Sequence, residues 1–259
     1  MLGLSSASYE SGTGKGNIEI ASARQPLVWY AFDEILRNGV FPADGSEFPS
    51  SDSTTALASK GSNAITINAN AGTPATNLGD MHRQSIKFDG TDDVIHMQSV
   101  VQSTNKAGTM LLVFNKSDAA NDIVVSEDDT ANAGKFYVKI TGSGNANVVI
   151  NMGSGHNAAK TFALSNRLTA GQDVVILIRR NTSGHVFIYT QNGLSVQNTA
   201  NSDVLAMPTF DFRFIGGATS TDFTGNIGEF AFWDIELSDA GCLAVIDSLK
   251  EKWNISDLA

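Results

Sequence analysis

The carboxylates near the end of the chain come nearest to a catalytic pattern. Glu229, Asp234 and Glu236 lie in GNIGEFAFWDIELSDAG, residues 225–241. Strand residues i and i+2 share a face, and a retaining glycosidase needs two carboxyl groups about 5 to 5.5 Å apart. Glu229 has no carboxylate two residues later, and Asp234 and Glu236 come where a helix cap should begin. We therefore expect no enzymatic activity, with a glycoside hydrolase or lyase as the least favoured alternative.

A second group of carboxylates, in FDGTDD, is a candidate calcium site. Asp89, Asp92 and Asp93 fall within one short turn, and Ca²⁺ prefers such oxygen-rich loops. In the alternative interpretation, Asp89 and Gly90 shape the turn while the other two carboxylates are solvated. We favour this alternative, so no cofactor is required, although calcium remains the one metal that the residues suggest.

Aromatic side chains are the candidates for carbohydrate binding. Trp29, Tyr30 and Trp233 are the preferred stacking residues, and Tyr137 and Tyr189 are further candidates. Aromatic residues on strands also pack in cores or cover sheets. We favour that alternative, because aromatic residues on the strands of a sandwich more often pack than bind. The sequence does not select a binding face.

The histidines and the single cysteine do not form a recognisable site. His82, His96, His156 and His185 are far apart in the sequence, without metal-ligand spacing. We assign them surface or packing roles. Cys242 lies on the expected apolar side of the last helix, which predicts a buried, unreactive thiol.

The composition limits the classes of partner. The 259 residues include 17 Lys and Arg and 27 Asp and Glu, a net charge of −10. Such a chain repels a nucleic acid backbone. It also lacks the run of about 18 apolar residues that a membrane-spanning helix needs and an N-terminal signal pattern. We expect no nucleic-acid partner, no membrane insertion and synthesis in the cytoplasm without a signal peptide.

The elements that must position these residues are mainly strands. Residues 1–25 are rich in Gly, Ser and Ala and predict an N-terminal arm, followed by one domain over 26–259. Short apolar runs separated by turn residues begin at 27–34 and indicate antiparallel strands. Residues 38–80 resemble a polar loop with one strand at 64–68. The other predicted strands are 84–89, 94–97, 109–115, 123–126, 135–141, 148–152, 174–180, 185–190, 210–216 and 227–235.

Two local patterns add detail to this arrangement. The runs MLLVF and VVILI are apolar at consecutive positions, so both faces of these strands must be covered. The pair Asn192-Gly193 predicts a tight hairpin turn with two positive φ angles. Ser238 is placed to cap an amphipathic helix that ends near Trp253, and we expect this helix to cover an end of the sandwich.

Three segments together resemble the concanavalin A-like, laminin G-like jelly-roll superfamily. They are SIKFDGTDDVIHM (85–97), DVVILIRRNTSGHVFIYTQNG (173–193) and the final strand with its trailing helix (225–253). The resemblance implies an all-β, two-sheet antiparallel jelly-roll sandwich with one C-terminal helix. It also implies faces or rim loops that often bind carbohydrate. The superfamily contains lectins, hydrolases, adhesion modules and viral structural domains, so the fold alone does not define the function.

The arm, the jelly roll and the missing signal pattern together resemble virion structural proteins of tailed bacteriophages. This resemblance implies a non-enzymatic capsid decoration, fibre or tail appendage at the virion surface. The arm would attach the protein to other virion proteins or to sister subunits, in a homo-oligomer such as a trimer. The jelly roll would face a host surface glycan. The alternative is a carbohydrate-binding lectin or adhesion module.

Overall fold

The computed structural model describes most of the chain after its N-terminal segment. The described residues are 25–34, 45, 57–62, 65–71, 74–77, 79–103, 106–118, 122–127, 136–141, 144–152, 160–198, 210–217 and 222–258. The predicted arm, apart from its last residue, lies outside them. Within these ranges, no helix is both long and apolar enough to cross a membrane.

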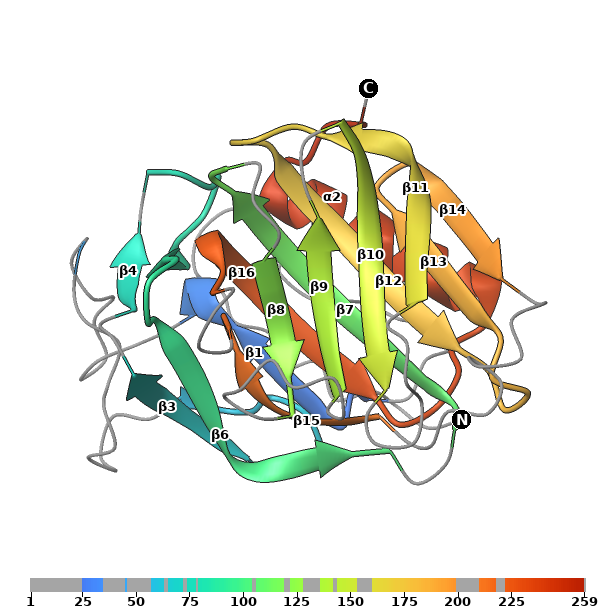
Figure 1. Cartoon of the computed structure of the whole chain (residues 1–259), viewed down its shortest axis with the longest axis horizontal. Helices are drawn as coiled ribbons and strands as arrows, with labels where there is room; N and C mark the ends of the chain where they lie inside the picture. Colours follow the sequence, from blue (N-terminus) through green and yellow to red (C-terminus); the bar gives the residue numbers. More distant parts are fainter. Residues whose placement is uncertain are drawn as a thin grey trace.

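Two antiparallel sheets, each of eight strands, pack face to face in the described part of the chain (Figure 1). Sheet I contains β1 (Val28–Ala31), β4 (Ala75–Asn77), β5 (Ser85–Asp89), β7 (Gly108–Lys116), β12 (Asp173–Arg180), β13 (Val186–Thr190), β14 (Gly193–Asn198) and β16 (Thr224–Trp233). Its order is β14-β13-β12-β7-β16-β5-β4, with β1 also paired to β16.

Sheet II contains the remaining strands. They are β2 (Leu57–Ala58), β3 (Thr66–Ala71), β6 (Val94–Gln102), β8 (Asp122–Ser126), β9 (Phe136–Thr141), β10 (Gly144–Met152), β11 (Lys160–Leu168) and β15 (Asp211–Ile215). Their order is β11-β10-β9-β8-β15-β6-β3-β2. The two sheets confirm the predicted all-β jelly-roll sandwich.

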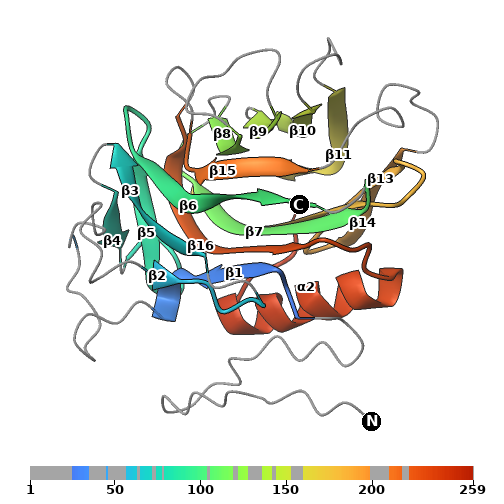
Figure 2. The same cartoon turned by 90° about the horizontal axis from the view of Figure 1, so that it is seen from below.

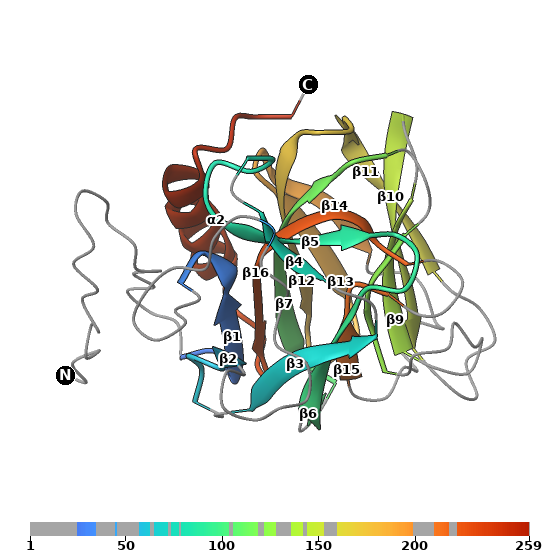
Figure 3. The same ribbon diagram turned by 90° about the vertical axis from the view of Figure 1, so that its left-hand side faces the viewer.

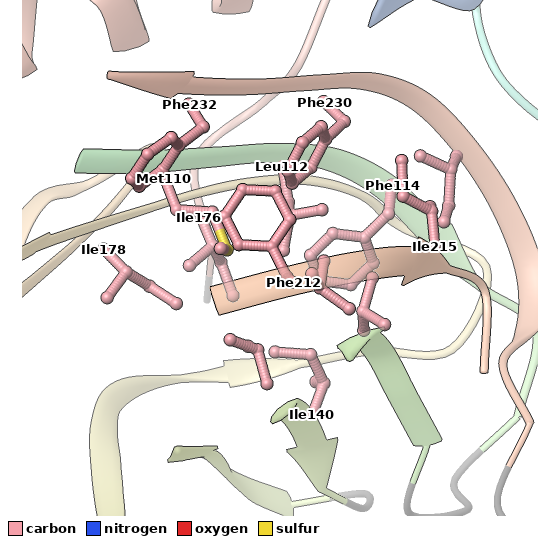
Figure 4. Close-up of a cluster of buried hydrophobic side chains, with 14 of the residues drawn as sticks. Met110, Leu112, Phe114, Ile140, Ile176, Ile178, Phe212, Ile215, Phe230 and Phe232 are labelled. Carbon is pink, nitrogen blue, oxygen red and sulfur yellow. The ribbon is translucent and has the colours of Figure 1, made fainter. Parts of the chain in front are cut away.

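The main hydrophobic core fills the space between the sheets (Figure 4). Met110, Leu112 and Phe114 alternate along β7 and point into this core, where they are fully buried. Phe230 and Phe232 enter it from β16. The alternation follows from the strand period of two, which sends every second side chain to the same face.

A second hydrophobic cluster covers the opposite face of sheet I. Leu111 and Val113 of β7 and Val175 and Leu177 of β12 pack there against helix α2 (Asp239–Trp253). The two clusters explain why MLLVF and VVILI are apolar at consecutive positions. They confirm the prediction that both faces of these strands are covered. The expected position of the helix was wrong, because it lies against the outer face of sheet I and not at an end of the sandwich (Figures 2 and 3).

The ends of α2 are stabilised by local caps. Ser238 Oγ accepts a hydrogen bond from the Gly241 amide at 3.1 Å, which satisfies one of the free donors of the first turn. At the other end, Asn254 adopts the left-handed conformation with φ 51°. The predicted cap and the buried face that ends at Trp253 are confirmed.

The predicted strands differ from the observed ones mainly in the less apolar segments. All ten strands predicted after residue 80 are present, and the strand predicted at 64–68 is β3. The strands β2, β4, β11 and β14 were not predicted from the sequence. The predicted turn was also shifted: Thr190 pairs with Gly193, so Gln191 and Asn192 make the connection. Only Gly193 has a positive φ there, 97°.

Candidate functional site

The first catalytic candidate, Glu229, is a fully buried residue of β16. Its Oε1 accepts hydrogen bonds from Lys252 Nζ and from Trp253 Nε1, the latter at 2.8 Å. Its Oε2 accepts one from Trp29 Nε1 at 2.9 Å. Both oxygens therefore accept hydrogen bonds that join β16 to β1 and α2, and neither faces solvent.

Asp33 completes this group, which we name the buried charge cluster: Asp33, Glu229 and Lys252. Asp33 Oδ1 accepts a hydrogen bond from Lys252 Nζ at 2.9 Å, and its Oδ2 lies 2.8 Å from Arg83 Nε. Burial raises the pKa of Asp33 above its usual range, against the opposing effect of Lys252. The cluster ties the 3-10 helix η1 (Phe32–Glu34) to β16 and α2.

The carboxylates that follow the C-terminal end of β16 form contacts around the first residue of helix α2. Arg179 forms an ion pair with Asp239, and its Nη1 lies 3.9 Å from Glu236 Oε1. Tyr189 donates a hydrogen bond to Asp239 at 2.8 Å. This hydrogen bond and the positive charge of Arg179 keep the pKa of Asp239 below its usual value, although burial opposes them. These contacts explain the position of the carboxylates without catalysis.

The preferred aromatic candidates are not available to a sugar. Tyr30 is fully buried, with its hydroxyl donating to the Ile65 carbonyl at 2.9 Å, and Trp233 is 1% exposed. Because stacking needs an accessible ring face, these two residues take the packing role that the sequence favours for strand aromatics. Trp29 is half-buried, and Lys60 Nζ lies 4.3 Å from the centre of its ring. Its face is thus already occupied by a cation.

The acidic turn after β5 brings its three carboxylates together. Asp89, Asp92 and Asp93 have oxygens within 4.8 Å of one another. Asp93 Oδ2 accepts from the Asp89 amide at 2.8 Å, and Asp89 Oδ1 accepts from the Thr91 amide at 2.7 Å. Gly90 supplies the positive φ of 78° that the turn requires. The hydrogen bonds give two of these carboxylates a role in shaping the turn.

A row of side chains that the sequence did not predict lies on the outer face of sheet II. Tyr137 of β9 lies opposite Ser126 of β8, Ser126 lies opposite Phe214 of β15, and Phe214 lies opposite His96 of β6. Directly opposite residues share a face. The neighbours Val138, Ile95 and Ile215 point into the core, so the row points outward. We name these four residues the cross-strand row.

A β-bulge places Phe214 in this row. The pairing of β15 with β6 changes register between Phe212 and Phe214. Without the bulge, these two residues would share a face. Instead, Phe212 packs in the core, and Phe214 stacks on His96 with ring centres 5.1 Å apart and planes at 22°. Between these pairs β15 advances from Phe212 to Phe214 while β6 runs from Val101 to His96. The pattern FDFRFI shows no sign of this irregularity, so the sequence predicts one face for both.

The cross-strand row combines ring faces with polar groups. Tyr137 and His96 are half-buried, so part of each ring reaches the surface. Neighbouring strands lie about 4.8 Å apart, so Tyr137 and His96 are about 14 Å apart across three strand intervals. Aromatic rings pack against apolar faces, and the phenol and imidazole can exchange hydrogen bonds with hydroxyl groups. Ser126 and Phe214, between these two residues, are 2% and 8% exposed, so a ligand would contact the row at Tyr137 and His96. Two contacts about 14 Å apart suit an extended ligand with several sugar rings.

Two cations adjoin the row. Arg213 Cζ lies 6.0 Å from the centre of the Phe214 ring, and its Nε donates to the Met97 carbonyl at 3.4 Å. Burial and the positive charge of Arg213 lower the pKa of His96. Lys139, two residues after Tyr137 on β9, points to the same face.

Comparison with known proteins identifies relatives at the level of family and fold. The family model described as the concanavalin A-like lectin/glucanases superfamily matches residues 89–241. This segment includes the whole cross-strand row and Glu229. No curated protein matches the sequence.

Several solved structures share the fold at low sequence identity. Domain 4 of AbnA, a GH43 extracellular arabinanase from Geobacillus stearothermophilus, solved with arabinotriose, aligns with a TM-score of 0.56 and 15% identity. The alignment covers 86% of this chain and 98% of that one. The binding domain of botulinum neurotoxin serotype G aligns with a TM-score of 0.59 and 15% identity, over 89% of this chain and 54% of that one. The chain thus spans about half of the toxin structure.

Proposed function

Since the chain belongs to the concanavalin A-like lectin/glucanases superfamily, we propose that it is a non-enzymatic, lectin-like module that binds glycans. The binding surface is the outer face of sheet II. The observation that carries the proposal is the cross-strand row, where Tyr137 and His96 present partly accessible rings from two strands of one face. The likeness in fold to a domain solved with arabinotriose supports the same class of ligand.

The positions of the acidic residues favour binding over hydrolysis. Both oxygens of Glu229 are hydrogen-bonded and buried, and Asp239 is paired with Arg179. A glycosidase needs two carboxyl groups that face the scissile bond. Aromatic stacking and hydrogen bonds to hydroxyl groups need no metal, so the proposed binding mode is independent of a cofactor.

Replacing Tyr137 with alanine is expected to weaken glycan binding by about two- to tenfold, because one aromatic stacking contact contributes about 0.5 to 1.5 kcal/mol. A glycan array identifies the ligand, and isothermal titration calorimetry measures its Kd for the wild type and the variant. Leu243→Ala is the matched control, since Leu243 is 40% exposed on α2, which covers the other sheet.

Two results would contradict the proposed site and function. Binding that survives in Tyr137→Ala and His96→Ala but disappears in Trp29→Ala would move the site to the opposite side of the sandwich. Release of reducing sugar that is lost in Glu229→Gln or Glu236→Gln would show an enzyme. The thermal unfolding of each variant is measured beside its activity, so that a folding defect is recognised.

We further propose that the module is a tailed-bacteriophage virion protein, carried on the capsid or tail as a decoration, fibre or appendage subunit. The Gly- and Ser-rich residues 1–25 and the jelly roll after them support this assignment. The protein would form a symmetric homo-oligomer such as a trimer.

Deletion of residues 1–25 is expected to remove the protein from purified particles while leaving the thermal unfolding of the jelly roll unchanged. Mass spectrometry of density-purified particles measures incorporation, and light scattering measures the oligomer. Normal incorporation of the truncated protein would refute the role of the arm. Absence of the full-length protein from particles would refute the virion assignment and leave the glycan-binding proposal intact.

A further inference from the structure

Two basic residues on the outer face of sheet II, Lys139 and Arg213, have no carboxylate partner among the described residues, although the chain carries a net charge of −10. Neither Lys139 nor Arg213 makes an ion pair within the described part of the chain. Most other described basic residues do make one: Lys60, Arg83, Lys87, Lys116, Arg179, Lys250 and Lys252. In an acidic protein, unpaired cations that gather on one face indicate a surface suited to an anion.

These two cations lie on opposite sides of the cross-strand row. Lys139 lies opposite Ile123 on β8, whereas Ser126 of the same strand lies opposite Phe214. Because β8 and β15 are antiparallel, Arg213 lies beyond Ser126, away from Ile123. A ligand that follows the row therefore passes between a guanidinium and an ammonium group.

The surroundings of His96 are also suited to an anion. Its ring stacks on Phe214, and Arg213 is the charged group that acts on it. An anion bound beside Arg213 would offset this positive charge and favour the imidazolium form. His96 would then add a third donor to the same ligand.

We propose that the ligand of this face is an acidic glycan, whose carboxylate or sulfate groups are bound by Arg213 and Lys139 while its sugar rings pack along the cross-strand row. This inference rests on the proposed glycan-binding function and specifies its ligand class. Arg213 suits the role because a guanidinium binds planar anions through two parallel hydrogen bonds.

The test compares acidic glycans with neutral forms of the same backbone. An array carrying uronic-acid, sialylated, sulfated and neutral glycans selects the ligand and distinguishes carboxylate from sulfate. Calorimetry then compares the preferred glycan with its carboxyl-reduced or desulfated form. Removal of the charge is expected to weaken binding about tenfold or more, because hydrogen bonds to charged groups exceed neutral ones.

The variants Arg213→Gln and Lys139→Gln should reproduce that loss with the acidic glycan and leave a neutral glycan unaffected. Lys87→Gln is the control, since Lys87 is an exposed cation of sheet I that pairs with Asp80 at 3.3 Å. A second readout is the His96 titration by NMR. The pKa of His96 should rise when the acidic glycan is added, so binding should strengthen as the pH falls through this pKa.

The outcomes separate the two proposals. Equal binding of the charged and neutral forms, with loss in Tyr137→Ala, would overturn the acidic-ligand inference and keep the glycan-binding function. Binding of no glycan on the array would overturn both. Retained acidic-glycan affinity in the double variant Arg213→Gln, Lys139→Gln, with normal thermal unfolding, would overturn the assignment of these two residues.

Discussion

Lys252→Met is expected to lower the free energy of unfolding by about 3 to 5 kcal/mol, the usual cost of removing one partner of a buried ion pair. Lys252 is 7% exposed, and its Nζ contacts both Glu229 and Asp33. Methionine keeps most of the length of the side chain but leaves two buried carboxylates with one cation fewer. Urea denaturation at neutral pH measures the loss.

The neighbouring lysine of α2 provides a matched control. Lys250 pairs with the exposed Asp257 at 2.6 Å, and partly exposed pairs of this kind contribute about 0 to 1 kcal/mol. Lys250→Met should therefore cost little beyond its hydrogen bond to the Gln191 carbonyl. Equal losses in the two variants would show that the buried charge cluster contributes no more than a surface pair.

The pH dependence of this effect has a defined sign. Burial lowers the pKa of Lys252, but the charges of Glu229 and Asp33 outweigh it and raise the pKa above the ordinary 10.5. The stability that this shift contributes is fully present below the ordinary pKa and is lost as the pH rises through the folded-state pKa. In Lys252→Met, Asp33 loses the cation that opposes the rise of its pKa, so its buried carboxyl group favours protonation. The variant should therefore be closest to the wild type at acid pH and further from it at neutral pH.

Phe212→Ala should likewise cost about 3 to 5 kcal/mol, because it opens a cavity between the sheets. The Phe212 ring is fully buried and meets Phe230 and Phe232 edge-on, with ring centres 5.5 and 5.0 Å away. Figure 4 shows Phe212 between the side chains of the two sheets. Thermal and urea unfolding measure the loss.

Phe214→Ala is the matched comparison, because the β-bulge places Phe212 and Phe214 on opposite faces of sheet II. Phe214 lies on the outer face against His96, outside the inter-sheet core. Phe214 is 8% exposed, and its removal leaves no cavity between the sheets. The variant should therefore cost less stability than Phe212→Ala and weaken glycan binding mainly by removing the ring on which His96 stacks. Equal destabilisation by both variants would contradict the assignment of the two residues to opposite faces.

The sequence alone determined the local elements of this fold. The period of two in segments such as 84–89 predicted strands, and the consecutive apolar residues of MLLVF correctly required cover on both faces. Ser238 and the apolar spacing up to Trp253 predicted the helix and its buried face. These features depend on neighbouring residues, so a short window of sequence contains them.

Only the tertiary structure decided the positions of the functional candidates. Glu229 forms an ion pair with Lys252 and accepts a hydrogen bond from Trp29, which is 200 residues away in the chain. The cross-strand row unites four strands, and the β-bulge that turns Phe214 outward leaves no mark in the local pattern. The physical reason is that strand pairing and register join distant segments, while periodicity reports only which face a residue takes relative to its neighbours.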